Sequence, residues 1–351
     1  MPSSRTTMLA SKNASLPNSQ AQSRRKHHQA IIHIRLLKKW LFPLILVLTS
    51  SFLLQIFSRV HIMLQDPISL DIYNIAYPRP YNYILNEPQK CSGQPPFLVL
   101  MIPVAPENRK VRDVIRETWG DENSMPTVKI RRIFYLGLPS QDGSGGLQED
   151  LRRESRWHHD LVQKDFQDTY FNLTIKTMMI MDWLVSYCSK ASYAMKIDTD
   201  MFLNVDTLVN KLLQLQAPRA KVNFITGNVH HFGIIRRDQD SKWYMPLKLF
   251  PGLFYPPYVS GIGYVFSVDL AKKILSVSLS VMPIHLEDVY VGMCLQKLGI
   301  QPTQPADSTW FSFQPVEYSR CRFSRLISVS HLEPDQLLHI WKDLEKAKDH
   351  C

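Results

Sequence analysis

Short apolar runs alternate with amphipathic segments along most of the chain. The runs at 97–102, 130–136, 191–197, 224–227 and 263–267 are too short for helices, which predicts buried strands. Apolar residues recur at helical spacing between these runs, which predicts helices. The predicted helices cover 108–119, two pieces within 147–187, and 270–275. Strands that alternate with helices indicate an α/β domain with a largely parallel sheet, which we place at 95–351.

The N-terminal part has a different pattern. Residues 1–39 carry eight Lys or Arg and no acidic residue, residues 40–58 are predominantly apolar, and residues 59–94 are rich in Pro, Tyr and Asn. An apolar helix of roughly 20 residues spans a bilayer, and its basic flank stays in the cytosol. We therefore predict a cytosolic tail (1–39), a single-pass type II signal anchor (40–58), a stem (59–94) and a lumenal domain. The small polar residues Thr49-Ser50-Ser51 leave a cleaved signal peptide as the alternative.

The charge of the chain is concentrated in that tail. The formal net charge is +10, and residues 1–39 supply eight of these charges. The remaining 33 basic and 31 acidic residues nearly balance, so the domain has no excess of positive charge for a nucleic acid to bind. We therefore expect no nucleic-acid partner.

A lumenal domain folds in an oxidising compartment, where cysteines pair. The chain has five cysteines, which allows two disulfides and one spare thiol, and Cys351 would allow a cross-linked homo-oligomer. The triplet Asn172-Leu173-Thr174 is an N-glycosylation acceptor on the lumenal side. A second such triplet at Asn13 would face the cytosol.

The strand predicted at 191–197 ends in Asp198-Thr199-Asp200. Open α/β sheets bind ligands at the carboxyl ends of their strands, so these two carboxylates would lie at the edge where a ligand binds. Hard oxygen ligands in that position suit Mg²⁺ or Mn²⁺ carrying a diphosphate. The alternative is a polar turn that follows a strand.

Other polar clusters suggest further parts of a site. Arg112 and Arg116 lie one helical turn apart and would clamp phosphates, or else form an exposed basic face paired with Asp113 or Glu117. Residues 165–177, which include Asp168 and Lys176, offer acids, an aromatic and a lysine around a helix start, where a simple N-cap is the alternative.

Two later segments add aromatic and acidic groups. Aromatic rings stack on the apolar faces of sugars, and glycines allow close approach of a backbone. The residues with these properties are Trp243, Tyr244, Tyr258 and Gly261, and packed aromatics in a surface turn would explain them as well. Glu287 and Asp288 precede an apolar helix and would either cap it or supply a general base.

Taken together, these segments resemble a known family over residues 85–351. The matching motifs lie at 115–119, 134–137, 172–177, 198–200, 255–258 with Gly261, and 287–292. Their order, behind a type II anchor, is similar to that of the membrane-anchored β-1,3-galactosyltransferases. These are inverting glycosyltransferases of family 31, a group that also contains β-1,3-N-acetylglucosaminyltransferases. Residues 85–91 look more like the galactosyl members.

The resemblance implies a GT-A fold, a UDP-galactose donor, an acceptor glycan on a glycolipid or glycoprotein, and a place in the Golgi membrane. It implies Mn²⁺ bound through Asp200, with Asp198 beside it and His331 as a late histidine ligand. It also implies that Asp288 is the catalytic base, with Glu287 as the substitute, and that Cys294 pairs with Cys321. The donor-binding residues that it implies are Arg112, Arg116, Asp168, Lys176, Asp198, Thr199 and Asp200.

The chain departs from the family pattern at two positions. Thr199 stands where an acid or serine is common, and Val259 stands where related chains often carry cysteine. Three other functions stay open at this point. They are a β-1,3-N-acetylglucosaminyltransferase, a phosphotransferase with Asp198 as its nucleophile, and a catalytically silent lumenal sugar-binding protein.

Overall fold

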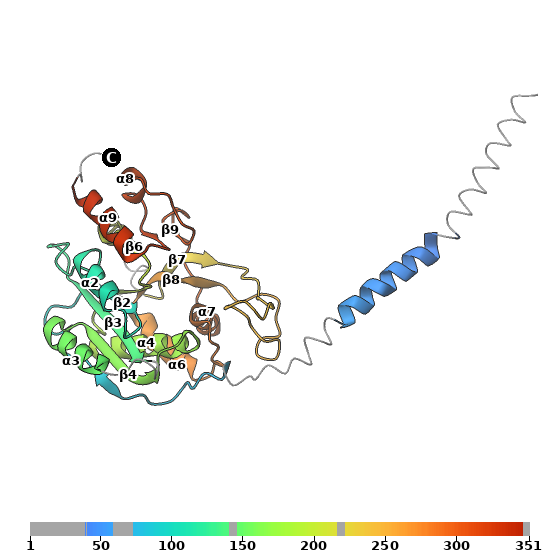
Figure 1. Cartoon of the computed structure of the whole chain (residues 1–351), viewed down its shortest axis with the longest axis horizontal. Coiled ribbons are helices and arrows are strands. Elements are labelled where there is room, and N and C mark those ends of the chain that lie inside the picture. Colours follow the sequence, from blue (N-terminus) through green and yellow to red (C-terminus); the bar gives the residue numbers. More distant parts are fainter. Residues whose placement is uncertain (1–38, 40, 59–72, 140–145, 216–221, 347–351) are drawn as a thin grey trace, which may run out of the picture. The chain divides into compact units, whose positions relative to one another are not determined.

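The structure is a computed structural model that describes residues 39, 41–58, 73–139, 146–215 and 222–346 (Figure 1). The chain divides into two units, residues 1–67 and 68–351, which we describe separately. In the first unit, the helix Leu41–Ser58 is long and apolar enough to cross a membrane. Its position agrees with the predicted anchor.

The second unit contains a seven-stranded sheet in the order β1-β4-β3-β2-β5-β8-β7. Strands β4, β3, β2 and β5 form parallel pairs, whereas β1 and β8 run against their neighbours. The sheet is therefore mixed around a parallel centre. The strand bounds are β1 Tyr83–Leu85, β2 Leu98–Pro103, β3 Ile130–Leu138, β4 Leu161–Gln167, β5 Tyr193–Ile197, β7 Ile225–His230 and β8 Tyr258–Ser267.

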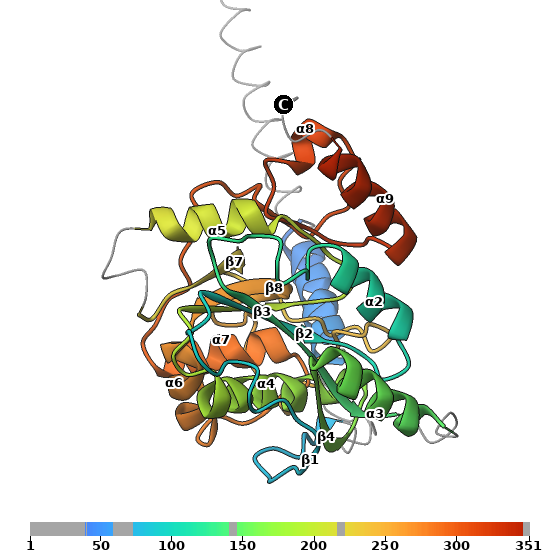
Figure 2. The same cartoon turned by 90° about the vertical axis from the view of Figure 1, so that its left-hand side faces the viewer.

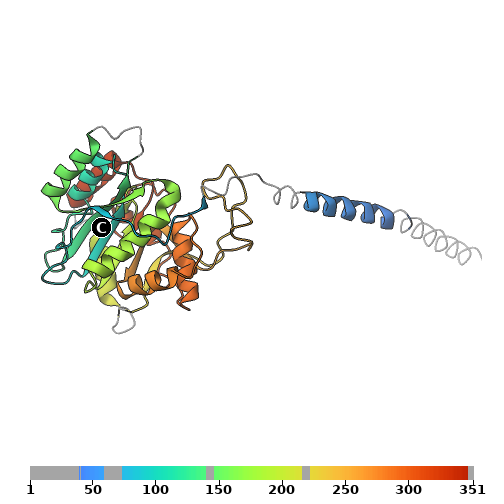
Figure 3. The same ribbon diagram turned by 90° about the horizontal axis from the view of Figure 1, so that it is seen from below.

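Helices cover both faces of this sheet because its central strands are buried on both sides. Alternate residues of β2 show the division: Leu98 and Leu100 join one apolar cluster, and Val99 and Met101 join the other. The first cluster packs against α2 (Arg109–Glu117), α3 (Leu147–His158), α5 (Val205–Gln214) and α9 (Pro334–Glu345). The second packs against α4 (Leu173–Tyr187), α6 (Asp269–Ser278) and α7 (Glu287–Lys297), which lie together on one side in Figures 2 and 3.

A small second sheet lies beyond the end of β5. Its order is β6-β10-β9, with β6 at Phe202–Leu203, β9 at Phe311–Ser312 and β10 at Ser328–Val329. The short helix α8 (Arg320–Phe323) lies between β9 and β10 along the chain. This sheet brings the C-terminal part of the chain to the residues that follow Asp200.

Two boundaries differ from the sequence prediction. The segment 147–187 contains a strand, β4, between its two helices, because its polar residues Gln163 and Lys164 are buried and bonded to Gln148 and Asp182. Residues 73–94, which we assigned to the stem, pack on the body. Aromatic and apolar side chains such as Tyr73 are buried there, and β1 pairs with β4.

The predicted disulfide between Cys294 and Cys321 is wrong. Cys294 is a free thiol in the core face of α7, where burial raises its pKa to about 12. Cys321 is exposed in α8, and its disulfide bond does not involve Cys294. Cys91 is bonded to Cys188, with 5.3 Å between their Cα atoms, and this bond ties residues 73–94 to the C-terminal end of α4.

Candidate functional site

The carboxyl ends of the parallel strands carry the candidate site, as the sequence predicts. Strand β5 ends at Ile197, and the Asp198 amide donates a hydrogen bond of 3.0 Å to the Ile262 carbonyl of β8. Asp198 is partly exposed, and Asp200 is exposed just beyond it. The strand therefore delivers both carboxylates to the sheet edge at which α/β proteins bind ligands.

Lys196 lies directly beneath these carboxylates. Its Nζ lies 2.7 Å from Asp198 Oδ1 and 2.9 Å from Glu287 Oε1, and it also donates to the Gly261 carbonyl. Burial lowers the pKa of Lys196, but the two carboxylates outweigh that effect, so the net shift is upward. A buried ammonium thus joins β5, β8 and the start of α7. Lys196 was not among the predicted site residues, although a lysine inside an apolar strand just before Asp-x-Asp indicates a buried partner for those acids.

Glu287 is enclosed on all sides by polar partners. Its Oε2 accepts hydrogen bonds from Thr177 (3.2 Å) and Tyr264 (3.3 Å), while Oε1 faces Lys196. Burial, joined by the charges of Asp288 and Asp198 and opposed by Lys196, raises the pKa of Glu287 to about 7. Glu287 therefore holds the site together from inside and has no open side for an acceptor.

Asp288, by contrast, is partly exposed at the first turn of α7. Its Oδ2 accepts a hydrogen bond from the Gly261 amide (2.9 Å), and its Oδ1 accepts one from the Val289 amide (2.8 Å). Backbone amides and the positive end of the helix dipole favour a carboxylate there. Asp288 is thus held in one orientation while it stays accessible.

Gly261 allows the acids to approach β8. A β-carbon at this position would lie 2.6 Å from Glu287 Oε1 and 3.3 Å from Asp288 Oδ2. Any side chain larger than hydrogen would therefore push both carboxylates away from the strand. We predicted Gly261 as an acceptor residue, and the structure places it against the acids.

The second sheet places His331 beside Asp200. Strand β10 pairs with β6 in antiparallel register, Val329 opposite Phe202, and the Leu332 amide donates to the Asp200 carbonyl at 2.9 Å. His331 adopts a left-handed backbone conformation with φ of 66°, which is uncommon for a residue with a side chain. The backbone next to His331 therefore contacts that of Asp200, 131 positions earlier in the sequence, and a metal ion shared by the two side chains stays a prediction.

The ring of His331 is oriented by Ser330. The Ser330 hydroxyl donates its single proton to the Phe313 carbonyl (2.9 Å), and its oxygen lies 2.7 Å from His331 Nδ1. In the tautomer that fits this arrangement, Nδ1 donates to the Ser330 oxygen and Nε2 keeps its lone pair. A hydrogen bond of this kind on the far nitrogen is typical of histidines that bind metals. Among the described residues, no three His, Cys, Asp or Glu side chains converge as a complete metal site.

Asp168 and Lys176 meet at the same edge of the sheet. Their side chains form an ion pair of 2.7 Å, the Gly137 amide donates to Asp168 (2.8 Å), and Lys176 donates to the Val104 carbonyl (3.1 Å). Burial lowers the pKa of Lys176, and the charge of Asp168 opposes this shift. The pair thus ties the residues that follow β2 and β4 to the end of β3. A direct contact of either residue with a nucleotide stays a prediction.

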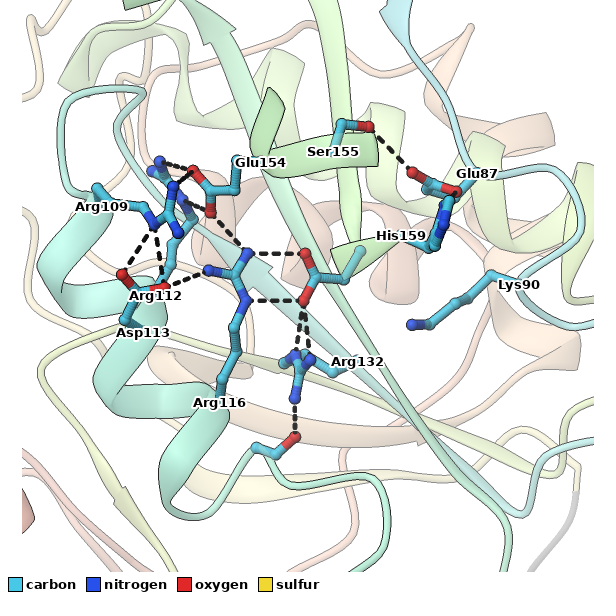
Figure 4. Close-up of polar contacts among 12 residues, drawn as sticks. Glu87, Lys90, Arg109, Arg112, Asp113, Arg116, Arg132, Glu154, Ser155 and His159 are labelled. Atoms are coloured by element: carbon cyan, nitrogen blue, oxygen red, sulfur yellow. Dashed lines mark hydrogen bonds and ion pairs between the residues drawn. The ribbon is translucent and has the colours of Figure 1, made fainter. Parts of the chain in front are cut away.

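The expected phosphate clamp does not form. Arg112 donates to both oxygens of Glu154 (2.8 and 2.7 Å), as Figure 4 shows. Arg116 donates to both oxygens of Asp160 (3.0 and 2.8 Å). Arg132 also binds Asp160, at 2.8 Å. These guanidinium groups neutralise buried carboxylates, so they have no free fork for a ligand.

Arg112 nevertheless supports the site from behind. Its Nη1 donates to the carbonyls of Ala105 and Pro106, at 3.1 Å each, which fixes the loop after β2. Trp119 does the same for the Asp-x-Asp turn, because its indole donates to the Met201 carbonyl at 2.8 Å. The first matching motif, residues 115–119, therefore stabilises the site from inside the protein through Arg116 and Trp119.

Comparison with known proteins agrees with this arrangement. A family model described as Galactosyltransferase matches residues 110–306. The chain belongs to the galactosyltransferase family. It is 46% identical over 282 residues to beta-1,3-galactosyltransferase 2 of Homo sapiens, covering 79% of this chain and 66% of that protein. It is 43% identical over 271 residues to beta-1,3-galactosyltransferase 1 of Mus musculus, covering 77% of this chain and 81% of that protein.

The chain thus spans just under two thirds of the human relative. Among solved structures, it is similar to a mannosyltransferase from Pyrobaculum calidifontis in complex with GDP-Man and Mn²⁺ (TM-score 0.36, 14% identity, 86% of this chain and 81% of that one). It is also similar to a glycosyltransferase involved in glycosylating the major capsid of PBCV-1 (TM-score 0.37, 8% identity, 71% of this chain and 100% of that one). Family membership therefore rests on the sequence comparisons, which confirm the resemblance and remove the phosphotransferase alternative.

The predicted acceptor aromatics fall into two groups. Tyr258 stacks on His230, with 5.0 Å between ring centroids, and burial followed by the charge of Asp288 raises the pKa of Tyr258 to about 12. Burial and the charge of Asp288 raise the pKa of Tyr170 to about 12 as well. Tyr258, His230 and Tyr170 are therefore close enough to Asp288 to be affected by its charge, and His230 and Tyr170 were not among the predicted site residues.

The other two aromatics lie on the insertion between β7 and β8, residues 231–257. Trp243 is half exposed, and Lys242 lies 4.9 Å from its ring centroid and 5.9 Å from that of Tyr170. Tyr244 is buried against Tyr73, at 6.1 Å, so its ring is not available to stack on a sugar. Tyr244 is thus a packing residue, whereas Trp243 stays a candidate.

The glycosylation triplet is integrated into the fold. Asn172 Nδ2 donates to the Gln167 carbonyl at 2.8 Å, and the buried Thr174 hydroxyl donates to the Ile284 carbonyl at 2.6 Å. Glycosylation of Asn172 stays a prediction, and it would have to precede the formation of these two contacts.

Proposed function

We propose that this chain is a β-1,3-galactosyltransferase with a GT-A fold that moves galactose from UDP-galactose to the 3-hydroxyl of an acceptor sugar, with inversion. The observation that carries the proposal is Asp288, an accessible carboxylate fixed by two backbone amides beside Tyr258 and near Asp198. One side of the site carries carboxylates and would face the donor, and the other side carries aromatic rings and would face the acceptor. The enzyme would act as a single-pass type II protein of the Golgi membrane.

In the reaction, the acceptor 3-hydroxyl oxygen attacks the anomeric carbon from the face opposite UDP. The new bond forms between that oxygen and carbon, the bond from the carbon to the UDP oxygen breaks, and UDP leaves with the electron pair. Asp288 accepts the hydroxyl proton. A positioned base of this kind contributes on the order of 10²–10⁴-fold.

Asp200 and His331 are the residues that would hold Mn²⁺, since a carboxylate and an imidazole with a free Nε2 suit this ion. When bound, the ion supplies positive charge that neutralises the diphosphate of UDP. Asp198, fixed by Lys196, would help to position the same ligand. Asp168 and Lys176 would hold the loops that border the nucleotide.

The test is a transfer assay with the full chain, Mn²⁺ and an acceptor that ends in N-acetylglucosamine, supplied with either UDP-galactose or UDP-N-acetylglucosamine. We expect transfer from UDP-galactose alone. Transfer from the other donor alone would assign the chain to the β-1,3-N-acetylglucosaminyltransferases of the family. No transfer across a panel of lipid-borne and protein-borne acceptors would favour the silent sugar-binding protein.

Replacing Gly261 by Ala should lower the transfer rate by on the order of 10²-fold, because displacement of a catalytic group by about 1 Å has that effect. The added methyl group would displace both Glu287 and Asp288. The matched control is Gly263→Ala on the same strand, where the nearest atom to the new methyl would be the flexible end of Met195, at 3.3 Å, and the next would be Ile197 Cγ1 at 3.6 Å. Equal rates for the two variants, at equal thermal stability, would show that close packing at Gly261 is unimportant.

A further inference from the structure

The insertion 231–257 carries a group of exposed apolar side chains. Phe232 is 80% exposed, Ile234 70%, Leu253 79% and Phe254 52%. Figure 1 shows the insertion, in gold, projecting from the ends of β7 and β8. Contiguous exposed apolar surface of this kind marks an interaction site in a soluble domain. We call these four residues the apolar tip.

The members of the apolar tip lie next to one another. Ile234 and Phe254 form an antiparallel bridge, the Phe232 and Phe254 rings are 6.4 Å apart, and the Ile235 amide donates to the Leu253 carbonyl at 3.4 Å. Four large side chains from two stretches of the insertion thus form one surface.

The insertion is also held in shape from within. The Arg237 guanidinium donates to three carbonyls, those of Met245, Phe250 (2.6 Å) and Gly252 (2.9 Å). A partly buried guanidinium that binds three carbonyls in this way fixes the conformation of the loop. The exposure of the apolar tip is therefore built into the insertion.

Exposed basic residues accompany the tip. Arg236, Lys242 and Lys248 are exposed on the insertion, against two acids, Asp238 and Asp240. Aromatic and aliphatic side chains next to Lys and Arg are the composition of surfaces that lie at a membrane interface.

A short segment of chain links the body to the candidate span. The described part of the body begins at Tyr73, whose ring packs against Tyr244 of the insertion, at 6.1 Å, and against His285, at 5.1 Å. Residues 59–72 separate Tyr73 from the end of the candidate span at Ser58. A segment of that length reaches at most about 50 Å, so a tethered body would meet the membrane surface at a high effective concentration.

We propose that the apolar tip docks the catalytic body on the lumenal leaflet of the bilayer that its own anchor crosses. This proposal rests on the membrane anchoring included in the proposed function. Gly233, inside the tip, packs directly on Tyr258, because a β-carbon there would lie 2.6 Å from the Tyr258 ring. Docking would therefore place the acceptor side of the site at the membrane surface and favour acceptor glycans that are carried on lipids.

The test uses the full chain in phosphatidylcholine vesicles with an environment-sensitive fluorophore on a cysteine at position 253 (Leu253→Cys). We expect a blue-shifted emission that nitroxide-labelled lipids quench. The control is Leu213→Cys on α5, a residue 55% exposed on an element of the opposite sheet face, which should stay unshifted and unquenched.

The alternatives give different results. Emission from position 253 that matches position 213 would overturn the docking proposal. A blue shift that lipid nitroxides do not quench would mean that protein, such as a second copy of the chain, covers the tip, and this would also overturn it. Neither readout requires catalysis, and flotation of the chain with the vesicles tests the anchor separately.

A second measurement tests the consequence for substrates. The double variant Phe232→Ser/Leu253→Ser should lose several-fold of its activity on a lipid-linked acceptor in vesicles while keeping its activity on the same glycan in solution. An equal loss on both acceptors, or on neither, would contradict a role in presenting membrane-borne acceptors.

Discussion

Replacing Asp288 by Asn should lower the transfer rate by about 10²–10⁴-fold while the affinity for UDP stays within the range of the wild-type protein. The amide of Asn cannot take up the proton of the sugar hydroxyl. Its oxygen can keep one of the two backbone hydrogen bonds, from Gly261 or from Val289. The measurement is kcat with UDP-galactose and acceptor, together with titration of UDP by calorimetry.

Glu287→Gln is the matched comparison, because it changes the neighbouring acid in the same way. Glu287 faces Lys196, Thr177 and Tyr264 inside the protein, so its loss should disturb the site without removing the base. If Glu287→Gln abolished transfer with UDP binding intact and Asp288→Asn did not, the roles of the two acids would have to be exchanged. A parallel loss of UDP binding and transfer in Asp288→Asn would refute the base assignment.

The parts of this molecule that the sequence predicts well are those set by local pattern. Strand β5 is an uninterrupted buried run, so the position of Asp198 and Asp200 at its carboxyl end follows from strand length and fold class. Asp288 was assigned its role because a motif of the family lies at the start of an apolar helix. The structure adds the two amides that fix its orientation.

The parts that were predicted wrongly depend on partners far away in the sequence. Arg112 and Arg116 have the spacing of a phosphate clamp, but Glu154 and Asp160, about 40 positions later, neutralise them inside the protein. Nothing in the pattern around Arg112 reveals that partner. A motif shared by a family therefore identifies a support of the site as readily as a ligand contact.

The same limit applies to Cys294 and to Tyr244. Cys294 lies on an apolar helix face, which periodicity shows, but its lack of a partner depends on which other cysteines reach it in space. Tyr244 sits beside the half-exposed Trp243, and only the packing of Tyr73 against it separates a core aromatic from a surface one. The sequence assigned Cys294 to a disulfide and Tyr244 to the acceptor site, whereas in the folded protein both side chains are packed in the core.

Replacing Lys196 by Met should destabilise the body by about 3–5 kcal/mol and abolish transfer. The substitution removes a buried ammonium that lies within 3 Å of both Asp198 and Glu287, and it leaves their carboxylates without a buried cation. Loss of one partner from a buried ion pair is costly because the remaining charge keeps its desolvation penalty. The measurement is the free energy of unfolding, from denaturant titration of the full chain in detergent, monitored by a spectroscopic probe in the body (residues 68–351).

The pH dependence of this loss distinguishes charge from packing. Glu287 has a pKa of about 7 in the folded protein against an ordinary value of 4.5, so its ionisation makes folding less favourable as the pH rises through that interval. Without Lys196 nothing offsets that ionisation, and the stability difference from the wild type should be largest above pH 7 and shrink toward pH 5. A difference that is constant with pH would indicate a simple loss of packing.

The double variant Lys196→Met/Glu287→Gln measures the coupling between the two residues, because it removes the cation and one of its anions together. It should recover a substantial part of the stability lost in Lys196→Met, since a neutral amide costs less to bury than an unpaired carboxylate. It should not recover transfer, because Asp198 and the start of α7 would still lack the ammonium that joins them. Additive losses in the two single variants and their combination would mean that Lys196 and Glu287 act independently, and the proposed link between the two carboxylate groups of the site would fail.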